Sequence, residues 1–170
     1  MLVYDNEALA LWIGTQLHKE FLPPYQCIGV ARGAELLAVA LFNNFDWPSI
    51  EITFATTSPR WASRQMIARI IGYPFIELDC RRITAVTGRR NKDARAFLLR
   101  FGFHEEGHHP ELFENDDGVS YGLLKRDAQK WLEIYRHERP QTTRSTRSLP
   151  DGTDRIAIRH QERDREQDPE

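Results

Sequence analysis

The sequence predicts an α/β domain with a mixed sheet, and three observations lead to this fold class. Seven short segments show the apolar runs or the alternation of β-strands, and four longer ones show apolar residues at helical spacing. The two kinds of segment interleave in the order β-α-β-β-β-α-β-α-β-β-α, which is typical of helices that pack against a sheet. Turn-forming residues separate most of the segments, so each element can be justified in order.

The first helix follows a short strand at residues 1–4. Asp5 or Asn6 can cap this helix, because either side chain can accept a hydrogen bond from the first turn. The helix is expected to run on until Pro23 and Pro24 stop it. Five apolar residues share its buried face: Leu9, Trp12, Ile13, Leu17 and Phe21.

A hairpin and another strand come next. Residues 27–31 and 36–42 are apolar runs on either side of a turn that contains Gly33, which is the pattern of a β-hairpin. In residues 50–55, three large apolar side chains alternate with smaller or polar ones, as a strand with one buried face requires. Glu51 lies on the opposite face of that strand.

The second half of the chain alternates helices and strands. Apolar spacing marks a helix that Pro74 ends or kinks, and residues 82–87 form a strand. Asn91 caps a third helix and Gly102 closes it. Residues 103–107 and 119–124 are strands around a loop that contains Pro110, and a last helix covers about 127–137.

Composition limits the class of protein. The 170 residues carry a net charge of −2 and are 41% hydrophobic, so the chain can form a core and is no general polyanion binder. No apolar run reaches membrane-spanning length, and residues 1–20 lack the flanks of a signal peptide. Cys27 and Cys80 lie in unrelated contexts, which does not indicate a disulfide framework or a zinc knuckle. A cytoplasmic location without a membrane partner is the default expectation.

The end of the chain differs sharply in composition. From residue 138 onward it is rich in Arg, Thr, Ser, Asp, Glu, Gln and Pro, and its large aliphatic residues are Leu149, Ile156 and Ile158. Such a segment buries too little apolar area to offset the entropy of ordering it. The sequence therefore predicts a flexible charged tail at 138–170, after a C-terminal helix at 127–137.

Three segments carry a resemblance to a known family. Residues 91–103, NKDARAFLLRFGF, form a helix that Asn opens and Gly-Phe ends, and residues 51–57, EITFATT, form a strand before a basic turn and a helix. In this order they resemble the GNAT superfamily of acetyl-CoA-dependent N-acetyltransferases. Residues 63–78, SRQMIARIIGYPFIEL, resemble a GNAT-like branch that phages and their hosts often encode. The resemblance covers about residues 1–126 and implies a GNAT-like domain there, with a mostly antiparallel sheet flanked by helices.

The resemblance also implies a site for acetyl-CoA as co-substrate. Strands 51–57 and 82–87 would splay apart to admit the pantetheine arm, and the turn between strand and helix would bind the pyrophosphate through peptide N–H groups, helped by Arg60 and Arg64. GNAT loops usually carry glycines here, whereas this chain has Ser63 and Gln65, so an ordinary capped helix is the alternative. The residues implied in cofactor binding are Ala55, Thr56, Thr57, Arg60, Trp61, Ala62, Ser63, Arg64, Gln65 and Asn91.

In this family an amine usually attacks the acetyl thioester directly. Glu51 is the candidate general base, because some GNAT enzymes carry a catalytic Glu on this strand, and a solvent-facing Glu is the alternative. The Tyr that usually acts as general acid is replaced by Leu98. Tyr73 and Tyr121 are other phenols, for which a core or surface position is the simpler explanation.

A polar segment follows the third helix. On a strand, His104, Glu106 and His108 would share one face. Nothing else in the sequence supplies ligand spacing typical of zinc, so a polar strand end is preferred to a metal site. In the GNAT interpretation this segment would border the acceptor pocket.

Three functions follow from these interpretations. The first is an N-acetyltransferase that transfers acetyl from acetyl-CoA to a primary amine of a small molecule or protein. The second is a GNAT-like module without catalysis, serving in binding or as a phage virion-associated part, which the missing loop glycines and Leu98 favour. The third, a nucleic-acid-modifying enzyme, is not favoured because no basic groove is evident. Trp131 and Tyr135 would anchor the last helix either to the domain or to a second subunit. A homodimer or a protein partner would use this helix or the tail, whose segment 139–147 is basic, and a solvated linker is the simpler explanation of that segment.

Overall fold

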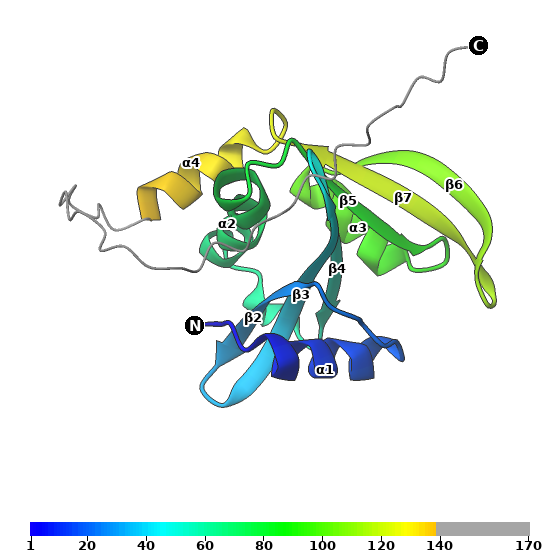
Figure 1. The fold of residues 1–170 in the computed structure, drawn as a ribbon, viewed down its shortest axis with the longest axis horizontal. Coiled ribbons are helices and arrows are strands. Elements are labelled where there is room, and N and C mark those ends of the chain that lie inside the picture. The colour runs from blue at the N-terminus through cyan, green and yellow to red at the C-terminus, as the bar shows by residue number, and fades with distance from the viewer. Residues whose placement is uncertain (139–170) are drawn as a thin grey trace, which may run out of the picture. The chain divides into compact units, whose positions relative to one another are not determined.

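A seven-stranded sheet with helices on both faces forms the fold (Figure 1). The computed structural model describes residues 1–138. The strands are β1 Leu2–Val3, β2 Gln26–Arg32, β3 Glu35–Asp46, β4 Ser49–Thr56, β5 Arg82–Gly88, β6 His104–Phe113 and β7 Asp116–Leu124. The α-helices are α1 Asn6–Leu17, α2 Arg64–Gly72, α3 Lys92–Phe101 and α4 Gln129–Glu138. The predicted order of strands and helices is confirmed.

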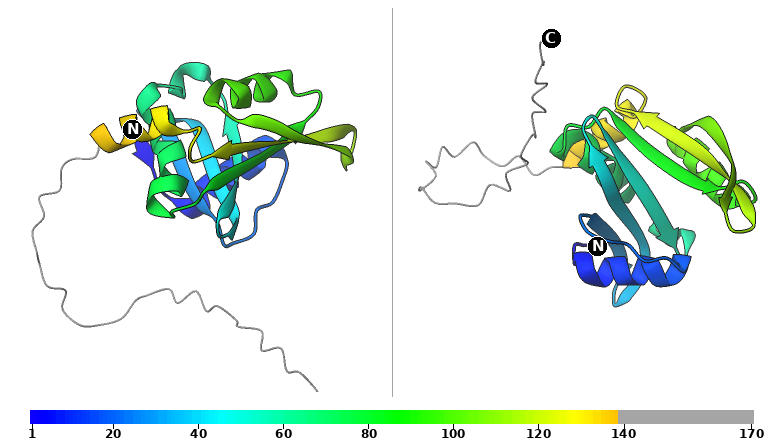
Figure 2. Two further views of the ribbon diagram at one scale, coloured as in Figure 1. Left: turned by 90° about the horizontal axis from the view of Figure 1, so that it is seen from above. Right: turned by 45° about the vertical axis from the view of Figure 1, so that its right-hand side comes forward.

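One parallel strand pair interrupts an otherwise antiparallel sheet of order β1-β2-β3-β4-β5-β7-β6. The parallel pair, β4 and β5, is in register only from Ser49–Arg82 to Glu51–Thr84. Beyond Glu51 the two strands diverge, and the right-hand view of Figure 2 shows the blue and cyan strands spreading away from the green and yellow ones. The splay that the sequence resemblance implied is therefore confirmed.

The two faces of the sheet carry separate cores. On one face, apolar residues of β4, β5 and β7 pack with α2, α3 and α4; on the other, α1 packs on β2, β3 and β4. Ile50, Ile52 and Phe54 belong to the first core and Ala55 to the second, as the predicted alternation requires. In residues 1–138, no helix covers the α1 face of β5, β7 and β6. That half of the sheet is therefore open on the side where Glu51 lies.

The first helix is shorter than predicted. It ends at Leu17 because His18 takes the left-handed conformation, with φ 50°, and its N–H bonds to the oxygen of Gly14. Pro23 and Pro24 come too late to be the stop signal. Leu17 is 40% exposed, while Phe21 still packs against the second core from the following loop.

The last two strands are longer than predicted. β6 continues to Phe113 and passes through Pro110, which was expected in a loop. Proline lacks the N–H that a central strand needs, but β6 is the edge strand of this sheet and needs donors on one side only. The hairpin turn lies at Glu114 and Asn115 instead.

The C-terminal helix α4 packs against α2 and belongs to the same compact domain. Gly72 makes room for it, since a Cβ at that position would lie 2.2 Å from the Tyr135 ring. The indole Nε1 of Trp131 donates to the backbone oxygen of Phe101 at 3.0 Å. Trp131 and Tyr135 are thus buried and anchor α4 to the domain, which is one of the two positions expected for them. Glu138, the first residue of the predicted tail, ends α4, and residues 139–170 with the basic segment lie outside the described residues. Among residues 1–138, no helix has the length and apolar character needed to cross a bilayer.

Candidate functional site at the splay of β4 and β5

The site begins where β4 and β5 separate. Because these strands run parallel, both carboxyl ends reach the same edge of the sheet, one leading to α2 and the other to α3. Ligands of open α/β sheets commonly bind at such an edge. Past Glu51, the β4 backbone has no pairing with β5. That stretch can therefore pair with an extended ligand.

The end of β4 is tied to β3. Thr57 N donates to the oxygen of Leu37 at 3.0 Å, and Thr56 Oγ1 donates to the same oxygen at 3.0 Å. The Thr57 amide is therefore occupied, and Ala55 is 7% exposed, in the second core. The segment predicted to contact pantetheine is Ala55–Thr57. It can offer a ligand only those peptide N–H and C=O groups that point toward β5.

Two peptide N–H groups of the turn before α2 donate to oxygens within the same turn. Ala62 N donates to the oxygen of Pro59 at 3.1 Å, and Ser63 N donates to the oxygen of Trp61 at 2.8 Å. Ser63 then caps α2, its Oγ accepting from Met66 N at 3.2 Å. The peptide N–H groups of Ala62 and Ser63 are therefore occupied within the turn, and phosphate binding by these two residues stays a prediction that depends on other groups.

Two amides remain at the N-terminus of α2. Within residues 1–138, neither Arg64 N nor Gln65 N has a recorded acceptor. Both residues are exposed, and so is Arg60, whose Nε donates to Ser58 Oγ at 3.2 Å. A helix N-terminus with two free amides and two arginines favours an anion electrostatically.

Trp61 lies in the core and is 4% exposed. Its ring packs on Phe54 of β4, with centroids 4.7 Å apart, and on Phe97 of α3, at 5.7 Å. Phe54 and Phe97 also stack on each other at 5.2 Å. The three rings join β4 to α3 on the helix side of the splay. The indole of Trp61 is therefore packed inside the first core, and little of its surface is left to contact a ligand.

Asn91 caps α3, as predicted from the sequence. Its Oδ1 accepts from Ala94 N at 3.1 Å. The cap occupies the carbonyl oxygen and leaves the side-chain NH2 for another partner.

Glu51 lies at the last rung before the splay. Its Cα is opposite Asn43 of β3 and Thr84 of β5. The carboxylate accepts from Asn44 Nδ2 at 2.9 Å. Asn44 reaches it because β3 loses register there and Asn44 adopts φ 49°, a conformation that Asn tolerates. Sequence reasoning missed Asn43 and Asn44, although two consecutive amides that end an apolar strand were a visible signal.

The phenols lie away from this rung. Leu98, at the position where the sequence resemblance implied a Tyr, is buried in the first core. Tyr121 is 0% exposed; its hydroxyl accepts from Arg95 Nε at 2.9 Å and donates to Glu105 at 3.0 Å. Tyr73 packs on Phe42, and burial raises its pKa. Tyr121 thus lies in the core, and Tyr73 is half-buried against it.

His104, Glu106 and His108 of β6 do not share one face. A bulge between Glu105 and Gly107 interrupts the alternation, so His108 lies opposite Val119, on the helix side. Glu106 lies on the open face, where it pairs with Arg82 of β5 above Gly122 of β7. Arg82 holds the pKa of Glu106 below its ordinary value. No group of side chains in residues 1–138 is arranged to hold a metal ion.

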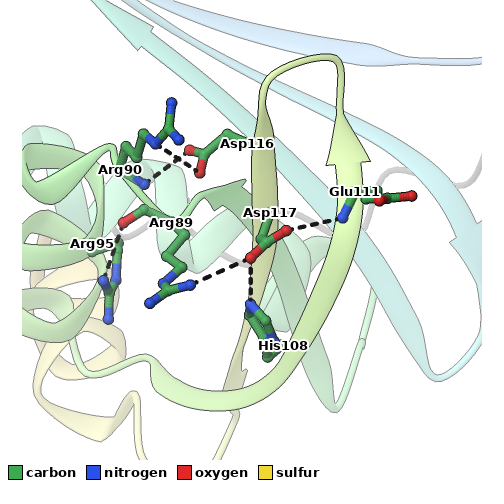
Figure 3. Close-up of polar contacts among 7 residues, drawn as sticks. All are labelled: Arg89, Arg90, Arg95, His108, Glu111, Asp116 and Asp117. Carbon is green, nitrogen blue, oxygen red and sulfur yellow. Dashed lines mark hydrogen bonds and ion pairs between the residues drawn. The ribbon is translucent and has the colours of Figure 1, made fainter.

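A second polar region lies between the start of α3 and the β6–β7 hairpin (Figure 3). It is an open groove of about 850 Å³. Arg89 pairs with Asp117 at 3.4 Å, and Asp117 also contacts His108 at 3.0 Å. Arg90 N donates to Asp116 at 2.8 Å. Arg90 Nε also lies 3.9 Å from Asp116 Oδ1. Arg89 and Arg90 therefore already face carboxylates in this groove.

Several solved structures that resemble this chain in fold are described as acetyltransferases. Mutant forms of the spermidine/spermine N-acetyltransferase SpeG from Vibrio cholerae match with a TM-score of 0.63 and 16% identity, over 76% of this chain and 97% of theirs. The dodecameric spermidine N-acetyltransferase from Vibrio cholerae matches with a TM-score of 0.60 and 17% identity, over 78% of this chain and 95% of that one. A structure described as a probable acetyltransferase shares 28% identity at a TM-score of 0.50, over 60% of this chain and 63% of that one.

No family model and no curated protein matches the sequence. The fold is nevertheless that of the GNAT acetyltransferases, a mostly antiparallel mixed sheet flanked by helices, and the predicted fold class is confirmed. These structures do not test the phage-type branch, which stays a prediction.

Proposed function

We propose that the protein is an N-acetyltransferase that moves an acetyl group from acetyl-CoA to a primary amine by direct attack. The observation that supports this most is the divergence of β4 and β5 directly beside an α2 N-terminus with two free amides. The divergence gives an extended thioester arm a backbone to pair with, and the helix end gives a diphosphate its donors. The acetyltransferase fold of the similar structures agrees with this assignment.

The chain would hold acetyl-CoA through a small set of groups. Arg64 N and Gln65 N would donate to the pyrophosphate, and the exposed Arg60 and Arg64 side chains would balance its charge. Ser63 can take part as well, because its oxygen accepts from Met66 N while its hydroxyl hydrogen is left to donate. Missing loop glycines are tolerable here, since peptide N–H groups survive any substitution except proline.

Glu51 would act as the general base. It lies on the open face at the point where the strands part, and Asn44 holds one of its oxygens. A base within hydrogen-bond reach of the acceptor would take the proton of the ammonium and free the nitrogen lone pair for attack. Because Leu98 is in the core, the departing thiolate would have to take its proton from the attacking nitrogen or from water.

A catalytically degenerate GNAT-like binding module is the second candidate. It is favoured by the core position of Leu98 and by the two turn amides that bond internally. This candidate predicts that no amine is acetylated, even when coenzyme A binds.

Thermal unfolding with and without acetyl-CoA tests the proposal. Ligand at one hundred times its Kd stabilises the folded state by about 2.7 kcal/mol, so a clear rise in Tm is expected. Release of coenzyme A thiol in the presence of spermidine, and then of other primary amines, separates the two candidates. Protection without thiol release supports the binding module. No protection at millimolar acetyl-CoA rejects the acetyltransferase and leaves the binding module.

A further inference from the structure

A buried oxygen beside Glu51 has no hydrogen-bond donor. Asn43 of β3 lies directly opposite Glu51 in the ladder, so the two side chains share the face that α1 partly covers. Asn43 Oδ1 is buried and, among residues 1–138, has no hydrogen-bond partner. Buried acceptors in folded proteins are nearly always paired, so this orphan needs an explanation.

The protonation state of Glu51 supplies an explanation for the unpaired oxygen of Asn43. Directly opposite residues of an antiparallel pair have Cβ atoms about 4.5–5.5 Å apart, which brings their side chains within reach of each other. An ionised carboxylate only accepts hydrogen bonds, whereas a protonated one also donates. Asn44 Nδ2 already donates to Glu51 Oε2 at 2.9 Å, and no donor to Oε1 is recorded in the described residues. A proton on Oε1 would therefore give Asn43 Oδ1 the donor that it lacks.

We propose that Asn43 is a positioning residue for Glu51, whose carbonyl accepts the O–H that Glu51 gains when it takes a proton. The source of that proton rests on the proposed function: it leaves the acceptor ammonium for Glu51. The freed nitrogen lone pair then bonds to the thioester carbonyl carbon. The C–S bond breaks, its electron pair goes to sulfur, and the thiolate takes the second proton that nitrogen loses.

The charged groups around Glu51 stay the same when Asn43 is changed. Arg82 of β5 and Glu106 of β6 share the face with Glu51 and pair with each other. His104 of β6 lies on the same face, opposite Gly122. On β3, Asp46 lies opposite Ser49 and is exposed, and the packed helix α1 carries one charged residue, Glu7, exposed in its first turn. A change in the titration of Glu51 in an Asn43 variant therefore reports the side chain of residue 43.

The test follows the side-chain carboxyl carbon of Glu51 by NMR in the free, labelled protein as pH is varied. Asn43→Leu keeps the approximate volume and removes the carbonyl, and its titration midpoint is expected about half a pH unit or more below that of the wild type. Asn43→Asp keeps an acceptor oxygen, and its midpoint is expected at or above the wild-type value. An Asn43→Leu midpoint equal to the wild type's would overturn the proposal.

Stability provides the second readout. Because Oδ1 has no partner, Asn43→Leu is expected to melt at the wild-type temperature or higher. A melting temperature several degrees lower would show that the resting fold uses the amide, and it too would overturn the proposal. Neither measurement needs acetyl-CoA or an acceptor, so this inference can fail while acetyl-CoA still protects the protein, or hold when it does not.

Discussion

Ser63→Ala tests whether the α2 N-terminus holds a phosphate or is only a capped helix end. Ser63 Oγ accepts from Met66 N at 3.2 Å, so the variant loses an N-cap. That loss costs about 0.5–2 kcal/mol of stability, or roughly 2–8 °C in Tm for a domain of this size. A hydrogen bond to a charged group is worth about 1.5–3 kcal/mol, so loss of the hydroxyl donor should weaken coenzyme A binding roughly 10- to 150-fold.

Asp5→Ala is the matched control, because Asp5 caps α1 by accepting from Ala8 N at 3.1 Å. It should lower Tm by a similar amount and leave coenzyme A affinity unchanged. Calorimetric titration with coenzyme A and thermal unfolding supply both quantities for each variant. If Ser63→Ala loses stability but binds coenzyme A as tightly as Asp5→Ala does, Ser63 is a cap alone and the phosphate contact is refuted.

Three further predictions concern charge, packing and pH. Arg64→Gln should weaken coenzyme A binding about 3- to 10-fold in low salt and change stability by less than about 0.5 kcal/mol, because the side chain is exposed; an unchanged Kd speaks against this arginine. Gly72→Ala should destabilise by about 1–3 kcal/mol in urea unfolding, since its Cβ would lie 2.2 Å from the Tyr135 ring; a neutral result would mean that α4 shifts freely. Arg82 lowers the pKa of Glu106, so the pair stabilises the fold above the ordinary carboxyl pKa and this contribution fades as pH falls through the lowered one. Glu106→Gln should thus be less stable than wild type near pH 7 and equal to it in strong acid, and a pH-independent difference would contradict the pair's role.

The order of strands and helices could be predicted because the signals for them are local in the sequence. Alternation in β4, the cap at Asn91 and the closing Gly102 each depend on residues close in the chain, and the structure has each of them. The errors arose where a distant or unusual conformation decided the outcome. His18 ends α1 in the left-handed conformation, which His adopts more often than most residues but not often enough to predict a helix end from the sequence. Pro110 stays in a strand because β6 lies at the sheet edge.

The site was less predictable for the same reason. The position of the turn before α2 was predicted correctly from the sequence. The sequence did not indicate that the N–H groups of Ala62 and Ser63 would donate to the oxygens of Pro59 and Trp61. The contact of Asn44 with Glu51 depends on a register change in β3, which exists only in the assembled sheet. Spacing along one strand also failed for His108, because a bulge turned it away from Glu106.

Amide NMR during titration with coenzyme A decides whether the α2 N-terminus binds the diphosphate. The peptide N–H signals of Arg64 and Gln65 are expected to shift strongly and saturate together, while those of Ala62 and Ser63, which bond within the turn, shift less. Shifts confined to the groove around Arg89 and Arg90, or no shift at all at millimolar coenzyme A, would contradict this expectation.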